Sequence, residues 1–129
     1  MRNVYPTSNL PLYIHDGFDL DRFSTFVASR EDFVVQDHHS YFVFTPSDAN
    51  EPALDHLSDI QGGIRYSFQQ ASYQERRNLV VDEFSCALTD NSLQNEPDPD
   101  QARQDFCTGQ VEIYANVTAG WSFWGRPNS

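Results

Sequence analysis

The stretch Asn78-Leu-Val-Val-Asp-Glu-Phe-Ser-Cys-Ala-Leu88 decides the fold that the sequence predicts. Its short apolar run, Leu79–Val81, suits a strand that is buried on both faces of a parallel sheet. Asp82 and Glu83 follow at the C-terminal end of this strand. In a barrel of alternating strands and helices that end faces the active site, so a carboxylate there is a candidate for chemistry. The alternative is a strand followed by a solvated acidic turn.

Three further strands and three helical segments are expected around this strand. We predict strands over Leu10–Gly17, Phe33–Tyr41 and Ala119–Trp124. We predict one helix capped by Asp19, one over Leu54–Arg77, and one that begins at Pro99 with Asp98 as its N-cap. Polar loops are expected over Pro46–Asn50 and Thr89–Asp100. Connections of roughly 25 to 40 residues carry crossover helices rather than hairpin turns, so the order predicts a parallel α/β fold.

Composition limits the kinds of partner that the chain can bind. The 129 residues make one modest domain, half of a typical (β/α)8 barrel. Acidic residues number 19 and basic ones 8, which gives a net charge of −11. This charge argues against nucleic acid or an anionic membrane as a partner and fits a neutral ligand such as a sugar. No stretch approaches the roughly 20 apolar residues that span a bilayer.

Other features bear on the compartment. No signal peptide is visible in Met1–Asn9, which lacks a basic segment and an apolar segment. Two cysteines and one sequon, Asn116-Val-Thr118, nevertheless hint at an exported protein that is glycosylated at Asn116. Cys86 and Cys107 either form a disulfide or remain two buried thiols.

Polar and aromatic residues gather where the four predicted strands end. They are His15 and Asp16, Asp37 to Tyr41, Asp82 and Glu83, and Trp121 to Trp124. In a barrel these ends meet at one rim. A carboxylate can attack an anomeric carbon, His and Tyr can hydrogen-bond hydroxyl groups, and indole stacks on the apolar face of a pyranose. The pattern therefore predicts a sugar site in which His15, Trp121 and Trp124 are candidate ligand contacts.

The two adjacent histidines are expected to play different roles. Neighbouring residues of a strand point to opposite faces, so His38 and His39 rarely share one metal ion. A metal site that adds Glu83 or His15 is therefore the less favoured alternative, and no cofactor is expected. His39 and Tyr41 lie on one face and are assigned to the site. For His38, we favour a buried residue hydrogen-bonded to the backbone over a contact with substrate.

These motifs together resemble a known family. The segments Asp37-His-His-Ser-Tyr-Phe-Val-Phe44, Val81-Asp-Glu-Phe-Ser-Cys-Ala-Leu-Thr89 and Gly120-Trp-Ser-Phe-Trp124 resemble fungal exo-β-1,3-glucanases of glycoside hydrolase family 5, and Ile14-His-Asp-Gly-Phe18 fits the preceding strand. The resemblance covers roughly residues 10–125. It implies secretion, a retaining mechanism and a TIM (β/α)8 barrel of which this chain holds strands five to eight.

Site residues are carried over from the family by position. Glu83 matches the nucleophile, and His39 and Tyr41 match a His-x-Tyr pair that lines the glucose subsite. The chain departs from the family at two places. Phe84 stands where the family usually has Trp, and Arg126 stands where the family has an aromatic residue at the rim.

The resemblance also implies a second catalytic group, the general acid. In the family this acid is the Glu of an Asn-Glu-Pro motif at the end of strand four. The chain contains Asn50-Glu-Pro52 and Asn95-Glu-Pro97, but neither follows an apolar strand, so we interpret both as coincidences.

The sequence and its family resemblance therefore predict the C-terminal half of a β-glucan hydrolase over residues 1–129, a partial barrel with four parallel strands. The predicted activity is hydrolysis of β-1,3-glucan or related β-glucosides as part of a larger barrel. The alternatives are a non-catalytic remnant that acts as a carbohydrate-binding or interaction module, and an unrelated open α/β domain. Self-association is expected, because a half barrel leaves strand edges unpaired.

Overall fold

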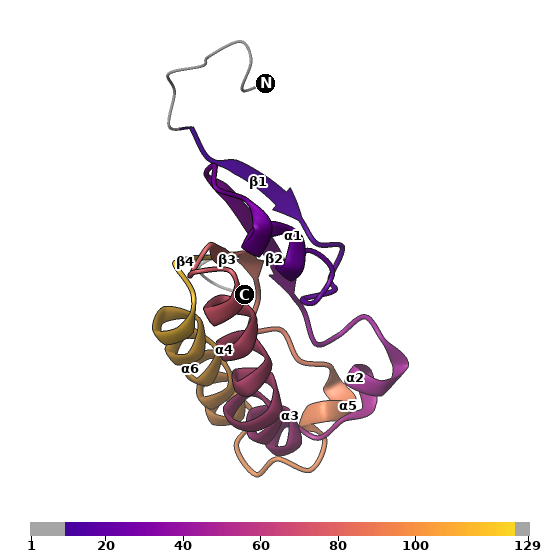
Figure 1. The fold of residues 1–129 in the computed structure, drawn as a ribbon. Helices are drawn as coiled ribbons and strands as arrows, with labels where there is room; N and C mark the ends of the chain where they lie inside the picture. Colours follow the sequence, from indigo (N-terminus) through magenta and orange to yellow (C-terminus); the bar gives the residue numbers. More distant parts are fainter. Residues whose placement is uncertain (1–9, 126–129) are drawn as a thin grey trace.

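The computed structural model describes residues 10–125, in which strands and helices alternate along the chain (Figure 1). The strands are β1 (Leu12–His15), β2 (Val34–Ser40), β3 (Leu79–Phe84) and β4 (Gly120–Phe123). The α-helices are α1 (Ser24–Ser29), α2 (Pro46–Asn50), α3 (Ala53–Asp59), α4 (Arg65–Gln74), α5 (Asp90–Leu93) and α6 (Pro99–Val117). A π-helical turn, η1 (Ile60–Ile64), joins α3 to α4. All four predicted strands are confirmed.

The strands form one parallel sheet in the order β1-β2-β3-β4. Each strand therefore pairs with the next one along the chain, and the helices lie in the connections. A doubly wound sheet reverses its strand order at a switch point, whereas a barrel adds its strands in sequence. The predicted four-stranded parallel sheet with crossover helices is confirmed, and it is consistent with part of an α/β barrel.

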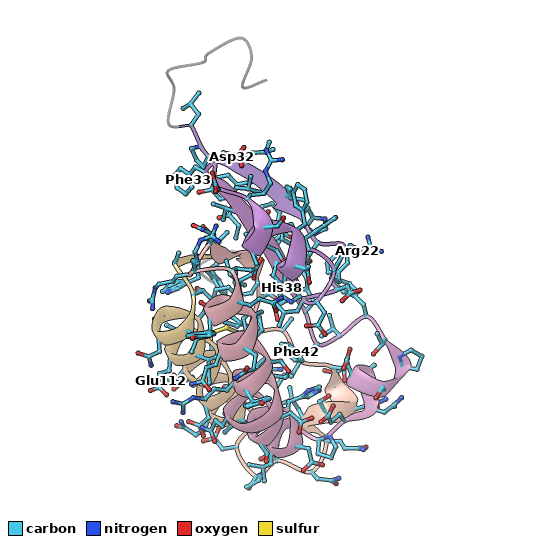
Figure 2. The ribbon with its side chains drawn as sticks, in the orientation of Figure 1. Arg22, Asp32, Phe33, His38, Phe42 and Glu112 are labelled. Carbon is cyan, nitrogen blue, oxygen red and sulfur yellow. A yellow bond between two sulfur atoms is a disulfide. The ribbon has the colours of Figure 1, made fainter. Side chains whose placement is uncertain are left out.

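Helices pack on one face of this sheet, and the hydrophobic core lies between the helices and the sheet (Figure 1). The fully buried members of the core include Leu79, Val81 and Phe84 of β3, Ile60 of η1, and Phe106 and Tyr114 of α6. Burying one large apolar side chain stabilises a fold by roughly 1.5–3 kcal/mol. Figure 2 shows His38 and Phe42 within the body of the domain, whereas Arg22 and Glu112 lie at its margins.

The opposite face of the sheet is open. Tyr13 of β1 points to this face and is 50% exposed. On β4, Ser122 alternates with Trp121 and Phe123 and is exposed as well. Within residues 10–125, β1 and β4 have a strand neighbour on one side only. This arrangement matches half of a barrel, in which further strands would pair with both edges and enclose the open face.

Two segments that we predict as polar loops contain short helices, so that prediction is wrong. Thr45 caps α2, because its Oγ1 accepts a hydrogen bond from the backbone N–H of Asp48 at 3.1 Å. Thr89 caps α5 in the same way through the N–H of Ser92, also at 3.1 Å. The two short helices contact each other, since the Thr89 hydroxyl donates to the carbonyl of Ala49 at 2.5 Å.

The predicted helix boundaries also need correction near Asp19. The chain forms turns after this residue, and α1 begins only at Ser24. Asp19 accepts instead from the N–H of Asp21 at 3.1 Å. The amide of Gln36 donates to the carbonyl of Leu20 at 2.7 Å, which ties the turn to β2. The predicted N-cap Asp98 of α6 is confirmed, because its Oδ1 accepts from the N–H of Gln101 at 3.1 Å.

A disulfide joins Cys86, three residues after Glu83, to Cys107 in the middle of α6, with Cα atoms 5.0 Å apart. The bridge closes a loop with a sequence separation of 21, so it connects the segment after β3 to the helix that covers β3. Cross-links of this span stabilise a fold by roughly 3 kcal/mol, chiefly by restricting the unfolded chain.

Replacing both cysteines with serine should therefore lower the free energy of unfolding by about 3 kcal/mol in urea denaturation. Adding a reductant should destabilise the natural chain and leave the double variant unchanged. Two reactive thiols in the folded, unreduced chain would contradict the bridge.

Candidate active site

Strand β2 and the residue directly after it bring three polar side chains to the open face of the sheet. Successive residues of a strand alternate between faces, so Asp37, His39 and Tyr41 share one side. The alternate residues Gln36, His38 and Ser40 are buried on the side of the helices.

Strand β3 places Glu83 on the same side by means of a register shift. His38 pairs with Val81, and His39 pairs with Glu83, so Asp82 is an extra residue without a partner on β2. A shift of one residue exchanges the two faces of a strand. Without the shift, Glu83 would follow Val81 to the helix side, and the exposed Asp82 would take its place on the open face.

Glu83 is contacted by His39 of β2 and by Tyr41, the residue directly after β2. The hydroxyl of Tyr41 donates a hydrogen bond to Glu83 Oε1. His39 Nδ1 lies 3.8 Å from Glu83 Oε2. Burial, and then the hydrogen bond and charge of Glu83, raise the pKa of Tyr41 to about 12, so this residue stays a proton donor at neutral pH. The structure thus brings together Glu83, His39 and Tyr41, three of the predicted site residues.

His15, at the end of β1, packs its ring beside that of His39. Its ring centroid lies 4.2 Å from that of His39. Phe18 packs edge-on against His15 at 5.3 Å and reaches His39 at 6.1 Å. Phe18 is a member of this cluster that our sequence analysis did not assign to the site. The dipeptide Asp16-Gly17 signals the turn that presents it, since Gly17 and Phe18 have φ angles of 66° and 67°.

His38 and Trp121 lie away from Glu83, on the helix side of the sheet. His38 Nδ1 is 2.6 Å from Asp16 Oδ2, and its ring packs edge-on against Phe68. It is buried as we expect, but its partner is a carboxylate rather than the backbone. Trp121 pairs with Val81 in the sheet and packs against Phe84, with ring centroids 5.7 Å apart.

Trp124 lies just beyond the end of β4, with its backbone N–H donating to the carbonyl of Phe84 at 2.7 Å. Its side chain is 65% exposed. With Phe123, Arg103 and the two cysteines it lines an apolar hollow of about 610 Å³. Trp124 is thus available to a ligand that approaches the ends of β3 and β4.

Neither Asn-Glu-Pro motif contributes to the cluster around Glu83. Glu51 faces His56 of α3, with Oε2 and Nδ1 3.5 Å apart. Glu96 lines a small hollow between α3 and the start of α6. In the part of the chain that the structure describes, the polar contacts of the Glu83 carboxylate are to Tyr41 and His39.

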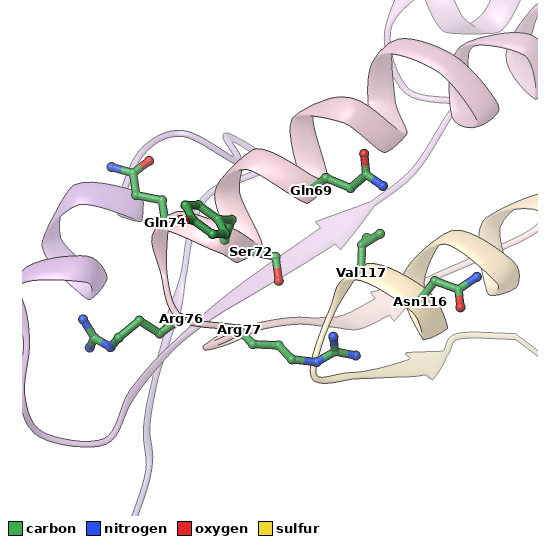
Figure 3. A pocket seen from close by; sticks show the side chains of 8 residues that line it. Gln69, Ser72, Gln74, Arg76, Arg77, Asn116 and Val117 are labelled. Carbon is green, nitrogen blue, oxygen red and sulfur yellow. The ribbon is translucent and has the colours of Figure 1, made fainter.

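A separate hollow of about 740 Å³ lies at the opposite end of the sheet, where α4 and α6 end (Figure 3). Gln69, Ser72, Arg77 and Asn116 line it. Arg76 belongs to its wall, but its guanidinium donates to the carbonyls of Ala28 at 2.6 Å and Arg30 at 2.5 Å. Arg76 therefore holds α1 against the end of α4. In a barrel this end serves stability rather than catalysis.

The sequon lies beside this hollow. Asn116 is exposed in the last turn of α6, while Thr118 is buried and its hydroxyl donates to the carbonyl of Tyr114 at 2.6 Å.

Within residues 10–125, no group of three His, Cys, Asp or Glu side chains is arranged to hold a metal ion. No helix in this range combines the length and apolar character needed to cross a membrane.

Comparison with known proteins relates the chain to glycoside hydrolases. It is 35% identical over 125 residues to a protein named glucan 1,3-beta-glucosidase 3 of Schizosaccharomyces pombe, an alignment that covers 95% of this chain. It is also 28% identical over 120 residues, 89% of its length, to an uncharacterized glycosyl hydrolase of Saccharomyces cerevisiae. No protein-family model matches the chain.

These similarities confirm the predicted resemblance to fungal glucan 1,3-β-glucosidases. The chain spans 26% of the first relative and 23% of the second, so it corresponds to about a quarter of each.

Proposed function

We propose that residues 1–129 form the C-terminal half of a β-glucoside hydrolase barrel and supply its nucleophile, Glu83. The observation that carries this proposal is the contact of the Glu83 carboxylate with Tyr41 and His39 at the C-terminal end of β3. The Tyr41 hydroxyl fixes one oxygen of this carboxylate and the imidazole lies beside the other, so the group is oriented as a nucleophile must be. The name of the S. pombe relative supports a β-1,3-glucan or a related β-glucoside as substrate.

The proposed reaction is retaining. Tyr41 holds Oε1 of Glu83, and a lone pair of Oε2 attacks the anomeric carbon and forms a glycosyl ester. A carboxylic acid roughly 5–5.5 Å from the nucleophile must protonate the departing oxygen, and the same group later activates the water that hydrolyses the ester. Because no carboxyl group of residues 10–125 contacts Glu83, this acid comes from elsewhere in the complete barrel.

A chimera tests the function directly. The aligned segment of the S. pombe relative would be replaced by this chain, and hydrolysis of an aryl β-glucoside would be measured beside the 129-residue chain alone. The chimera should hydrolyse the substrate with retention at the anomeric carbon. The chain alone should be slower by at least about 10²–10⁴-fold, the usual contribution of a general acid. Efficient hydrolysis by the chain alone would mean that Glu51 or Glu96 acts as the acid, with Glu96 the first to replace.

We also propose that the isolated chain self-associates. The open face of the sheet exposes Tyr13, and β1 and β4 each present an unpaired edge within the described residues. Light scattering at rising concentration should show an increasing mass, while insertion into the chimera should remove the effect. A stable monomer with a cooperative melt would count against this proposal.

The disulfide, the sequon and the relative's name together support a secreted or cell-wall protein.

A further inference from the structure

A second carboxylic group, Asp37, lies behind the site on the same face of β2. Asp37 Oδ2 is 3.3 Å from His39 Nε2, and the opposite ring nitrogen, Nδ1, faces Glu83. Asp37 pairs with Val80 in the sheet, two residues further from the C-terminal end of β2 than His39. Its side chain is 15% exposed. Asp37 is therefore placed to act on His39 rather than on a ligand.

The two ring nitrogens of His39 each face a carboxyl group, and these neighbours determine where the protons of the imidazole must lie. A neutral imidazole carries one N–H, and the other nitrogen is an acceptor. If the proton lay on Nε2 alone, the lone pair of Nδ1 would face the Glu83 carboxylate, which is unfavourable. A proton on Nδ1 instead presents a donor to Glu83. Nε2 must then interact with Asp37 either as a lone pair that accepts from a carboxylic acid or as an N–H that donates to a carboxylate.

Both of these favourable arrangements contain the same number of protons. One proton lies on Nδ1, and one is shared between Nε2 and Asp37 Oδ2. Burial raises the pKa of Asp37, an effect that the charge of His39 and the hydrogen bond with His39 partly offset. Asp37 Oδ1 is buried without a hydrogen-bond partner in the described part of the chain, which also favours a neutral carboxyl group.

We propose that Asp37 is a positioning residue that fixes an N–H group at Nδ1 of His39, directed at the Glu83 carboxylate. The inference rests on the proposed role of Glu83 as nucleophile. Together with the Tyr41 hydroxyl, this N–H places one donor beside each oxygen of Glu83. The two donors orient the carboxylate, and Asp37 keeps the second one in place while a sugar binds and leaves.

Nuclear magnetic resonance of the 15N-histidine-labelled chain tests the proposal without any catalysis. Long-range proton–nitrogen correlations at pH 7 distinguish a protonated ring nitrogen from one with a lone pair, and the His39→Gln variant assigns the signals. Nδ1 of His39 should be protonated in the natural chain. Finding Nδ1 as a lone pair with the proton on Nε2 would overturn the proposal.

Variants separate positioning from a purely structural role. Asp37→Leu should shift the proton of neutral His39 toward Nε2, whereas Asp37→Asn should keep it on Nδ1, because the Asn amide can donate to Nε2. Glu112→Gln on the exposed face of α6, away from the sheet, is the control and should leave the His39 signals unchanged. A structural role alone would lower the stability of Asp37→Leu without moving the proton, and that result would refute positioning.

The rate at which Glu83 is labelled in the chimera is the second measurement that tests the role of Asp37. In the chimera, Asp37→Leu should slow labelling of Glu83 by a 2-fluoro-glucoside by about ten- to a hundredfold, the range for losing one hydrogen bond to a charged group. Asp37→Asn should label within a few-fold of the unchanged chimera. A shifted proton with no labelling of Glu83 in the unchanged chimera would refute the proposed function and leave the role of Asp37 toward His39 intact. Equal labelling of Asp37→Leu and the unchanged chimera would refute the positioning role.

Discussion

Replacing Glu83 with Gln in the chimera is expected to lower the rate of aryl β-glucoside hydrolysis by at least about 10⁴-fold, the scale found when an enzyme loses its nucleophile. Gln keeps the size of the side chain and can still accept from the Tyr41 hydroxyl. Its neutral amide is a poor nucleophile, so the glycosyl ester cannot form. A 2-fluoro-glucoside with a good leaving group should label the unchanged chimera at the peptide that contains Glu83 and should not label the variant.

The neighbouring carboxylate provides the control for this experiment. Asp82→Asn removes the same charge one residue away, on an exposed side chain whose charge acts on Asp37, and should change the rate by only a few-fold. In a Glu83→Gly variant, azide should attack the vacated face of an aryl β-glucoside and expel the phenolate, which gives the α-glucosyl azide. Labelling of any other residue, or a rate in Glu83→Gln close to that of the unchanged chimera, would remove Glu83 from the nucleophile's role.

The strands of this fold can be predicted from the sequence more clearly than its short helices. Apolar runs such as Leu79–Val81 specify buried parallel strands, because those residues must be covered on both sides. The helices α2 and α5 have almost no apolar content, so their signal lies only in their caps. Thr45 followed by Pro46 and Asp48 has the residue types of a helix start, and attention to this pattern would have revealed α2.

The candidate site could be predicted as a group of residues, but its geometry could not. Strand ends identify Glu83, His39 and Tyr41 as neighbours, because all parallel strands of a barrel point to one rim. Strict alternation from Val81, however, would turn Glu83 toward the helices. The register shift at Asp82 reverses this, and it depends on how β3 pairs with both β2 and β4. Pairing between strands so far apart in the sequence leaves no local pattern to detect.

The burial of the Glu75 carboxyl group could not be predicted from the sequence either. Glu75 follows α4 and is completely buried, although nothing in Gln74-Glu75-Arg76 distinguishes it from a surface residue. Both carboxyl oxygens of Glu75 lack a hydrogen-bond partner among the described residues. Burial, and then the charge of Asp16, raise the pKa of Glu75 to about 8. The folded chain therefore holds Glu75 in its protonated form at neutral pH.

Replacing Glu75 with Gln is accordingly expected to stabilise the fold at pH 7 and to have little effect near pH 4. In the unfolded chain the carboxyl group ionises near its ordinary pKa of 4.5, whereas in the folded chain it keeps its proton up to about pH 8. The folded state then binds more protons between these two values, so the natural chain loses stability as the pH rises through this range. Gln has no proton to hold, and its free energy of unfolding should exceed that of the natural chain by about 3 kcal/mol at pH 7.

Urea denaturation of both proteins at several pH values between 4 and 9 measures this difference directly. Other groups titrate too: burial alone would raise the pKa of Asp16, but its hydrogen bond and ion pair with His38 and its hydrogen bond with Gln36 lower it. Asp16 and His38 are present in both proteins, so subtraction largely removes their contribution. Glu112→Gln on the exposed face of α6 is the matched control and should lie within about 0.5 kcal/mol of the natural chain at every pH. A Glu75→Gln difference that stays constant from pH 4 to 9 would mean that Glu75 is ionised in the folded chain, with a partner that the Gln side chain replaces.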